Sequence, residues 1–289
     1  MKQEIMIQLP ARKEIPATSI YAEIYTKTGH LGKRGVLMLV PGGPGNEHTV
    51  CDYAGESFAD ALLPHTDVIL FDPRGCGKNE KSPIQHCTLE HYIEDIESIR
   101  AHLQIPSNQY ALIGVSYGGI AALGYGVKYS SKLKKLILVC GAASGEFIEE
   151  AKKHLAEIGT PAQKKMGTAL LNGTFDFSSG YYDTMGPTYS LLFQPGMPTP
   201  NIAFNAELFN LGFSKFLREF DYRPELSKIK CQTLIISGEG DWICDTNQAK
   251  TLHHGIPGSK LLIYQDCKHM IWIDQRKRFL HDIIDFLTH

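Results

Sequence analysis

The chain has 289 residues, of which 43% are apolar and 21% are charged, a composition typical of a globular protein with one large core. Its formal net charge is −2 and its Lys and Arg residues are scattered, so it lacks the concentrated positive surface that nucleic-acid binding requires. No stretch approaches the roughly 20 apolar residues of a membrane-spanning helix, so we expect neither nucleic acid nor a membrane as a partner.

Short apolar runs rich in β-branched residues predict a parallel sheet. Residues 20–25 alternate between polar and apolar, as expected of an antiparallel edge strand. Strands buried on both faces are predicted at residues 36–40, 68–71, 110–113, 136–139, 233–236 and 260–264. Helical periodicity appears at residues 89–103, 117–129, 246–254 and 276–287. Strands that alternate with helices predict an α/β fold, with a mostly parallel sheet covered on both faces.

This alternation is interrupted between residues 145 and 222. Helical stretches there mix with Gly, Pro, Ser and aromatic residues, and no run typical of a buried strand occurs. The segment lies between two predicted core strands, so it is an insertion and not a separate tail. We therefore expect an α/β core formed by residues 1–144 and 223–289, with residues 145–222 inserted as a helical cap.

The motif Gly-Val-Ser-Tyr-Gly at residues 114–118 is a candidate nucleophile site. Ser116 directly follows the predicted strand at residues 110–113 and precedes a helical stretch. A GxSxG motif between a strand and a helix is typical of a nucleophilic serine. The serine occupies a strained turn, and the neighbouring glycines are needed because the turn leaves little room for side chains on either side. Ser116 is therefore the predicted nucleophile.

A serine nucleophile needs a base and a group that orients the base. In hydrolases with a nucleophile elbow, these follow the serine in the order acid, histidine. Asp241 lies just beyond the predicted strand at residues 233–236, and His269 lies beyond the last predicted strand. The carboxyl ends of parallel strands meet at one sheet edge, so both should converge on Ser116. Asp245 is the alternative acid, whereas Asp241 has the alternative role of a turn or helix cap.

The negative charge of a tetrahedral intermediate needs fixed hydrogen-bond donors. The backbone N–H of Tyr117, directly after the nucleophile, is one candidate donor. A second is expected in the Pro-Gly-Gly-Pro-Gly loop at residues 41–45, which follows the predicted strand at residues 36–40. We assign this role to Gly43, although a Gly- and Pro-rich loop can also be a plain turn.

The cysteines and the amino-terminal residues indicate a reduced compartment. Seven cysteines form an odd set without CxxC spacing, which predicts neither disulfides nor a zinc site. Residues 1–9 mix polar and apolar side chains and lack the apolar stretch of a signal peptide. We expect a cytoplasmic protein in which Cys140 and Cys231, which flank apolar runs, act as small buried apolar residues. We expect no metal and no cofactor.

Five segments of the chain resemble the proline iminopeptidase group of α/β-hydrolases. They occur in the order of that group and read GGPG at 42–45, DPRGCG at 72–77, GVSYGG at 114–119, GEGD at 238–241 and DCKH at 266–269. The resemblance spans nearly the whole predicted core and implies an α/β-hydrolase that releases an amino-terminal residue, often proline, from peptides. Residues 72–78 do not have P-loop spacing, so we expect a structural loop in which Asp72 and Arg74 pair with neighbouring groups.

The chain departs from this group at two positions. Pro41 stands where a histidine usually precedes GGPG, and Trp242 stands where related aminopeptidases can have a glutamate directly after the acid of the triad. Relatives use glutamates of the cap or rim to hold the substrate's ammonium group, because a buried cation needs an opposite charge. Glu207 is the candidate for that contact, with a solvated helix-face glutamate as the alternative, and Trp242 is a second candidate substrate-binding residue.

The sequence therefore predicts a serine hydrolase that forms an acyl-enzyme, most simply an aminopeptidase acting on short peptides. Cap aromatic residues are expected to line its apolar pocket; these are Phe175, Phe177, Tyr181, Tyr182, Tyr189, Phe193, Phe204 and Phe209. One alternative is an esterase, lactonase or amidase that acts on a small neutral acyl substrate. Another is a ligand receptor on the same fold. The sequence does not indicate the oligomeric state.

Overall fold

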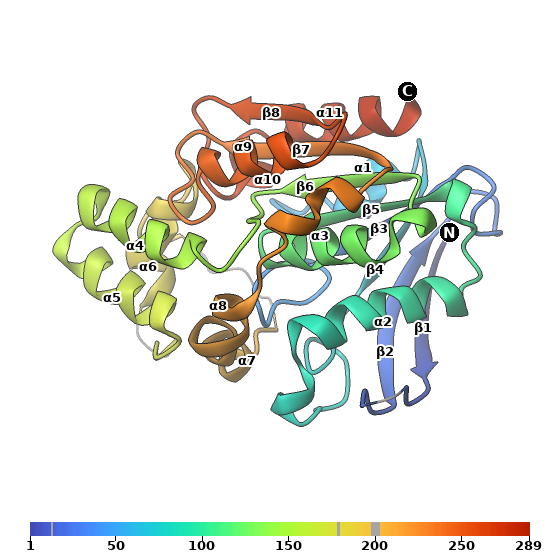
Figure 1. Ribbon diagram of the computed structural model, residues 1–289, viewed down its shortest axis with the longest axis horizontal. Helices are drawn as coiled ribbons and strands as arrows, with labels where there is room; N and C mark the ends of the chain where they lie inside the picture. The colour runs from blue at the N-terminus through green and yellow to red at the C-terminus, as the bar shows by residue number, and fades with distance from the viewer. Residues whose placement is uncertain (13, 178–179, 198–202) are drawn as a thin grey trace.

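The computed structural model describes residues 1–289 except 13, 178–179 and 198–202. Its described strands form one sheet in the order β1-β2-β4-β3-β5-β6-β7-β8 (Figure 1). The strands are β1 Lys2–Leu9, β2 Thr18–Tyr25, β3 Val36–Val40, β4 Asp67–Phe71, β5 Tyr110–Val115, β6 Lys135–Val139, β7 Gln232–Gly238 and β8 Lys260–Tyr264. β2 runs antiparallel to both of its neighbours, and every pairing from β4 to β8 is parallel, which confirms the predicted fold class.

The prediction that residues 20–25 form an edge strand is wrong, because β1 covers that side of β2. The two strands pair over their full length, from Lys2 opposite Tyr25 to Leu9 opposite Thr18. Only Ile7 and Leu9 of β1 are buried, so the strand has no continuous apolar run that its sequence could reveal.

Helices cover both faces of the sheet. One face carries α2 (Leu89–His102), α3 (Tyr117–Tyr129) and α9 (Thr246–Gly255), and the other carries α1 (Phe58–Leu62) and α11 (Arg276–Thr288). Successive side chains of β3 point to opposite faces. Val36, Met38 and Val40 accordingly pack with the first set of helices, whereas Leu37 and Leu39 pack with the second. The short helix α10 (Ile271–Asp274) precedes α11.

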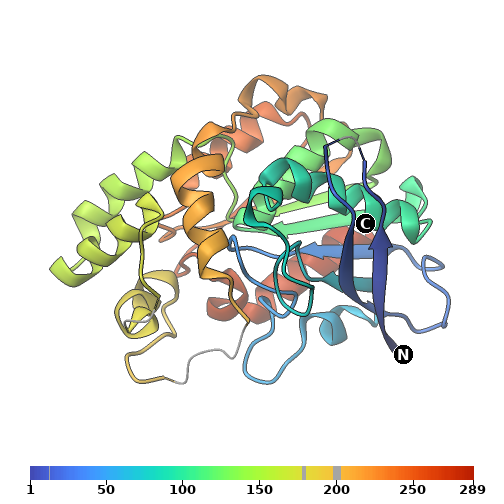
Figure 2. The same ribbon diagram turned by 90° about the horizontal axis from the view of Figure 1, so that it is seen from below.

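The segment between β6 and β7 contains helices and loops but no strand among its described residues. It contains α4 (Phe147–Ile158), α5 (Pro161–Asn172), α6 (Tyr181–Tyr189), α7 (Ala206–Leu211) and α8 (Leu217–Glu219). These helices gather at one side of the sheet, at the left in both views (Figures 1 and 2). The chain enters and leaves this group through adjacent segments, since Gly145 N–H donates to the Phe220 carbonyl and Tyr222 N–H donates to that of Ala143, both at 2.9 Å. We therefore propose residues 145–222 as a cap that is inserted into the core formed by residues 1–144 and 223–289.

The loop after β4 is structural, which confirms the prediction for Asp72 and Arg74. The Arg74 guanidinium forms two hydrogen bonds with the buried Asp95 carboxylate, at 2.8 and 2.9 Å. Asp72 is fully buried and accepts the backbone N–H of Lys78 at 2.7 Å. None of the described helices has the length and apolar character needed to cross a membrane.

Candidate active site

Ser116 lies at a tight turn between β5 and α3. Its backbone angles are φ 57° and ψ −121°, an unusual conformation for a residue with a side chain. The turn brings the first turn of α3 against the ends of β5 and β3. A Cβ atom on Gly118 would overlap the carbonyl of Val40, and one on Gly114 would overlap the carbonyl of Gly118. The two glycines of the motif are therefore required by close backbone packing.

The structure brings Ser116, His269 and Asp241 together in one hydrogen-bonded row. The Nε2 atom of His269 lies 3.0 Å from Oγ of Ser116, and its Nδ1 atom lies 2.8 Å from Oδ2 of Asp241. His269 and Asp241 are 5% and 3% exposed, so water competes little for these bonds. The three residues follow β5, β8 and β7 and meet at one edge of the sheet.

The two aspartates after β7 have different partners. Asp241 Oδ1 accepts the backbone N–H groups of Ile243 and Cys244 at 2.9 and 3.1 Å, which fixes the carboxylate while Oδ2 faces His269. Asp245 instead caps α9, where it accepts the N–H groups of Asn247 and Gln248 at 3.0 and 3.1 Å. Only Asp241 therefore contacts His269.

The two residues expected to supply oxyanion donors lie close to Ser116 along the chain or line the cavity in front of it. Tyr117 is the first residue of α3, so its N–H has no partner within the helix. The loop after β3 approaches Ser116, because a Cβ atom on Gly42 would lie 2.8 Å from the Val115 carbonyl oxygen and 3.2 Å from Cβ of Ser116. Gly43 follows with φ 118° and lines the cavity in front of Ser116.

A large, mostly apolar cavity opens in front of Ser116 and His269. Its volume is about 1030 Å³, and the cap forms much of its wall. Seven of the eight cap aromatics expected to line it do so: Phe177, Tyr181, Tyr182, Tyr189, Phe193, Phe204 and Phe209. The eighth, Phe175, packs edge-on against Phe177 with ring centroids 4.7 Å apart.

The two expected substrate-binding residues have different locations. Trp242 lines the cavity, is 2% exposed and donates its indole N–H to Oγ1 of Thr188 at 3.1 Å. Glu207 is exposed in the first turn of α7 and is not among the residues that line the cavity, so the structure does not bring it together with the triad. Among the described lining residues, the carboxylates are Asp52 and Asp183.

Asp52 was not predicted from the sequence, although it lies shortly after the GGPG loop. Its Oδ1 accepts the backbone N–H of Phe58 at 2.7 Å. The side chain is partly buried, and this burial raises the pKa of the Asp52 carboxyl group. Asp183 is exposed and its Oδ1 accepts the N–H of Gly196 at 2.9 Å. Asp52 is thus the less hydrated of the two carboxylates.

The wall that contains Asp52 is held from the far end of the chain. The Arg276 guanidinium, at the start of α11, donates to the Cys51 carbonyl at 3.0 Å and to the Glu56 carbonyl at 2.9 Å. It also lies 2.9 Å from the Glu56 carboxylate. Arg276 is 9% exposed, whereas the Glu56 side chain is 69% exposed, so the ion pair between them is open to water.

Two groups of metal-ligand types converge among the described residues. In the first, His269 is engaged by Asp241 and Ser116, and burial raises the pKa of the Cys140 thiol well above its usual range. In the second, the His48 ring contacts carboxylates directly, and we assign a metal to neither group. All seven cysteines lie in the described part of the chain and are free thiols. Cys140 is buried as predicted, but the prediction for Cys231 is wrong, because its side chain is only partly buried.

Comparisons with known proteins agree with this architecture. A family model described as the alpha/beta hydrolase fold matches residues 35–275. The proline iminopeptidase of Saccharolobus solfataricus is 28% identical over 293 residues, with 95% of this chain and 91% of the relative covered. The proline iminopeptidase PfmaB of Pestalotiopsis fici is 29% identical over 217 residues, with 72% and 76% covered. These relatives confirm the resemblance deduced from the sequence motifs.

A solved structure of an alpha/beta fold family hydrolase from Bacillus anthracis has a TM-score of 0.76 against this structure. It is 18% identical in sequence, and the alignment covers 99% of each chain. That similarity concerns the fold alone, and it extends over the cap as well as the core. The chain therefore belongs to the α/β-hydrolase fold family and is a serine hydrolase of that family.

Proposed function

We propose that the protein hydrolyses a carbonyl substrate through an acyl-enzyme on Ser116. The observation that carries this proposal is the hydrogen-bonded row from Ser116 Oγ through His269 to Asp241, with both bonds at 3.0 Å or less. His269 Nε2 takes the proton of the serine hydroxyl as Oγ attacks the carbonyl carbon. Asp241 keeps Nδ1 protonated and stabilises the imidazolium that forms.

The tetrahedral intermediate places its negative oxygen near the N–H groups of Tyr117 and Gly43. Fixed donors of this kind stabilise charge as it develops, and the loss of one costs roughly 3 kcal/mol. His269 then gives its proton to the leaving group, which departs and leaves the acyl-enzyme. A water molecule repeats the attack, again with His269 as base, and releases the acid and free Ser116.

We further propose that the substrate is a short peptide with a free amino terminus, such as one that begins with proline. The names of the relatives support this class, as does the cap that covers the cavity. In such a substrate the ammonium group needs an anionic partner within a mostly apolar cavity. Asp52 is our candidate for this partner in place of Glu207, because Asp52 lines the cavity and is partly buried.

A second candidate function is the hydrolysis of esters, lactones or amides with a neutral acyl group. The wall of the cavity favours this alternative, since most of its lining residues are apolar and Trp242 directly follows Asp241. This reaction uses the same triad and needs no carboxylate for an amine. A receptor without catalytic activity would use the cavity but not the triad.

The experiment compares prolyl para-nitroanilide, its N-acetylated form and para-nitrophenyl acetate as substrates. Asp52→Asn keeps an acceptor for the Phe58 N–H but removes the charge. We expect this variant to lower kcat/KM for the free amine by an amount equivalent to about 2 to 5 kcal/mol of transition-state free energy, the range for one partner of a buried charge pair. The values of kcat/KM for the N-acetylated substrate and the ester should hardly change. Glu207→Gln is the matched control and should change the same value by at most about 1 kcal/mol.

Each outcome separates the candidates. Preference for the free amine supports the aminopeptidase, and preference for the ester supports the alternative hydrolase. Asp183→Asn is the second variant. If it lowers kcat/KM for the free amine more than Asp52→Asn does, Asp183 is the residue that contacts the amine. If no substrate is turned over and an organophosphonate does not label Ser116, the result supports a ligand receptor without catalytic activity.

A further inference from the structure

The segment formed by residues 42–55 contributes to two parts of the candidate site. Gly43 supplies a proposed donor for the substrate oxygen, and the cavity wall includes Asn46, Thr49, Val50 and residues 52–55. The segment contains turns and one isolated bridge but no helix or strand. One backbone bond ties it to another part of the chain, from the Asn205 N–H to the Gly45 carbonyl at 2.9 Å. Side chains must supply most of the remaining support, since the segment lacks the regular backbone bonds of a helix or sheet.

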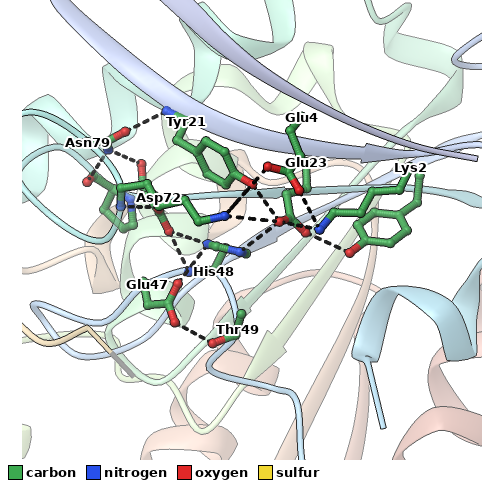
Figure 3. A network of polar contacts seen from close by, with 12 residues as sticks. Lys2, Glu4, Tyr21, Glu23, Glu47, His48, Thr49, Asp72 and Asn79 are labelled. Carbon is green, nitrogen blue, oxygen red and sulfur yellow. Dashed lines mark hydrogen bonds and ion pairs between the residues drawn. The ribbon is translucent and has the colours of Figure 1, made fainter. Parts of the chain in front are cut away.

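His48 is the central anchor of this segment. Its Nδ1 atom lies 2.6 Å from Oδ1 of Asp72 and 2.9 Å from Oε2 of Glu47, and its Nε2 atom lies 3.3 Å from Oε1 of Glu23. The backbone N–H of His48 also donates to Asp72 Oδ1 at 2.9 Å. Figure 3 shows the ring between Asp72 and Glu47 on one side and Glu23 on the other. One side chain thus joins the segment to β2 and to the loop after β4.

The three carboxylates are themselves fixed by further contacts. Glu23 accepts the hydroxyl groups of Tyr21 and Tyr25 at 2.8 and 2.7 Å and lies 2.8 Å from Nζ of Lys2. Glu47 accepts the hydroxyl of Thr49 at 2.6 Å, and Asp72 accepts the N–H of Lys78 at 2.7 Å. These partners lie on β1, β2, the loop after β4 and the segment itself.

The balance of charge in this cluster favours a protonated imidazole. Four carboxylates, those of Glu4, Glu23, Glu47 and Asp72, surround two ammonium groups, those of Lys2 and Lys78. The cluster would therefore carry a charge of −2 with a neutral His48 and −1 with an imidazolium. His48 is 4% exposed. Burial lowers its pKa, but hydrogen bonds to Asp72 and Glu47 outweigh burial and raise it to about 10.

We propose that His48 is a positioning residue, whose imidazolium fixes segment 42–55 so that the Gly43 N–H stays directed at the substrate oxygen. A charged ring held by carboxylates from three parts of the chain has one favourable orientation, which a neutral contact would define less strictly. The backbone between His48 and Gly43 is short, so a shift of the ring moves the donor. The proposal rests on the proposed function only for the roles of Ser116 and Gly43.

The test measures binding of phenylboronic acid beside hydrolysis of para-nitrophenyl acetate. The boronic acid adds to Ser116 Oγ and becomes tetrahedral and anionic, so its binding needs the oxyanion donors as the transition state does. His48→Gln should lower kcat by up to about a hundredfold and weaken boronate binding in parallel, because removal of a donor costs about that much. KM should change by no more than about twofold, because the ester carbonyl is uncharged in the ground state.

A second variant and a control distinguish positioning from folding. Glu47→Gln removes a single charge from the ring's surroundings and should produce the same pattern in smaller degree. Asp67→Asn removes another buried carboxylate at the opposite end of β4, where Asp67 Oδ2 accepts the Gly32 N–H at 2.9 Å. This control should lower the melting temperature while kcat and boronate binding stay near the wild-type values.

The results support or overturn the proposal in a defined way. Parallel losses of kcat and boronate affinity in a folded His48→Gln or Glu47→Gln variant support the proposal. If His48→Gln does not fold, the result for Glu47→Gln decides the test. Wild-type kcat and boronate affinity in either folded variant would overturn it. The proposal would also be overturned if Asp67→Asn lost kcat and boronate affinity to the same extent as the His48 and Glu47 variants. Activity that persists in Ser116→Ala would instead refute the proposed function.

Discussion

The backbone N–H of Met270 donates a hydrogen bond to the carbonyl of Tyr189 at 2.8 Å. Met270 directly follows His269, and Tyr189 is the last residue of the cap helix α6. The Tyr189 ring also lies near His269 and Trp242, with centroid distances of 6.1 and 5.8 Å. The loop that carries His269 is therefore packed directly against the cap.

Asp274 strengthens this junction, and its removal should weaken it. Its carboxylate accepts the Ser190 hydroxyl at 2.5 Å and the N–H groups of Leu191 and Lys268, each at 2.8 Å. We expect Asp274→Ala to reduce the free energy of unfolding by about 2 kcal/mol, because bonds to a charged acceptor are lost. Hydrogen exchange should rise at residues 189–192. In the control variant Asp183→Ala, one exposed bond is lost and the stability should hardly change.

The two aspartates after β7 should respond differently to the same substitution. Asp241→Asn should reduce kcat on the order of 10⁴-fold, because the amide no longer favours the correct tautomer of His269. Asp245→Asn should leave kcat nearly unchanged, since asparagine caps a helix about as well as aspartate. Steady-state kinetics of both variants checks this expectation. A larger loss in Asp245→Asn would contradict the assignment of Asp241.

The elbow glycines should not tolerate even a methyl group. In Gly118→Ala the new Cβ would overlap the Val40 carbonyl, so we expect a loss of at least 1 to 3 kcal/mol in folding free energy, roughly the cost of overpacking. Gly141→Ala is the control, because its Cβ would meet no atom closer than 3.4 Å. Chemical denaturation measures both. Equal stability of the two variants would show that the backbone relaxes easily at the elbow.

The buried His48 ring should make stability depend on pH on the alkaline side. Its pKa is raised from 6.5 to about 10, since bonds to Asp72 and Glu47 outweigh the effect of burial. A group with a raised folded-state pKa contributes its full stability below its unfolded-state pKa, and this contribution is lost as pH rises through the folded-state value. The wild type should therefore exceed His48→Gln in stability by less at about pH 11 than at about pH 6.

Denaturant unfolding of the two proteins across this range measures the difference. The other charged groups of the cluster are present in both proteins, so the comparison isolates the histidine. A difference in stability that stays constant with pH would mean that folding does not raise the pKa of His48.

The sequence predicted those parts of the site that depend on local backbone geometry. Ser116, Asp241 and His269 could be predicted to lie together because each comes shortly after an apolar strand, and the carboxyl ends of parallel strands share one edge of the sheet. Asp241 and Asp245 could not be separated from the sequence, because the choice depends on how the loop folds back. The structure assigns the helix cap to Asp245 and leaves Asp241 opposite His269.

Features that depend on packing between distant segments were missed. Glu207 has a suitable position in the sequence, but the orientation of α7 places its side chain outside the cavity. The His48 cluster joins residues near positions 2, 23, 48 and 72, which no local pattern connects. One sign of the cluster was present in the sequence, because Glu23 interrupts an otherwise apolar strand. In the structure this residue is 4% exposed. A buried carboxylate of this kind requires partners from elsewhere in the chain.

The contacts of Arg276 with the Cys51 and Glu56 carbonyls have a consequence for biosynthesis. Gly43 and Ser116 are synthesised early, whereas His269 and this arginine are synthesised after most of the chain has been made. Since domains begin to fold during translation from their amino-terminal side, the early part can form its sheet while the cavity wall is still open. We therefore expect hydrolytic activity to appear only after translation has passed Arg276.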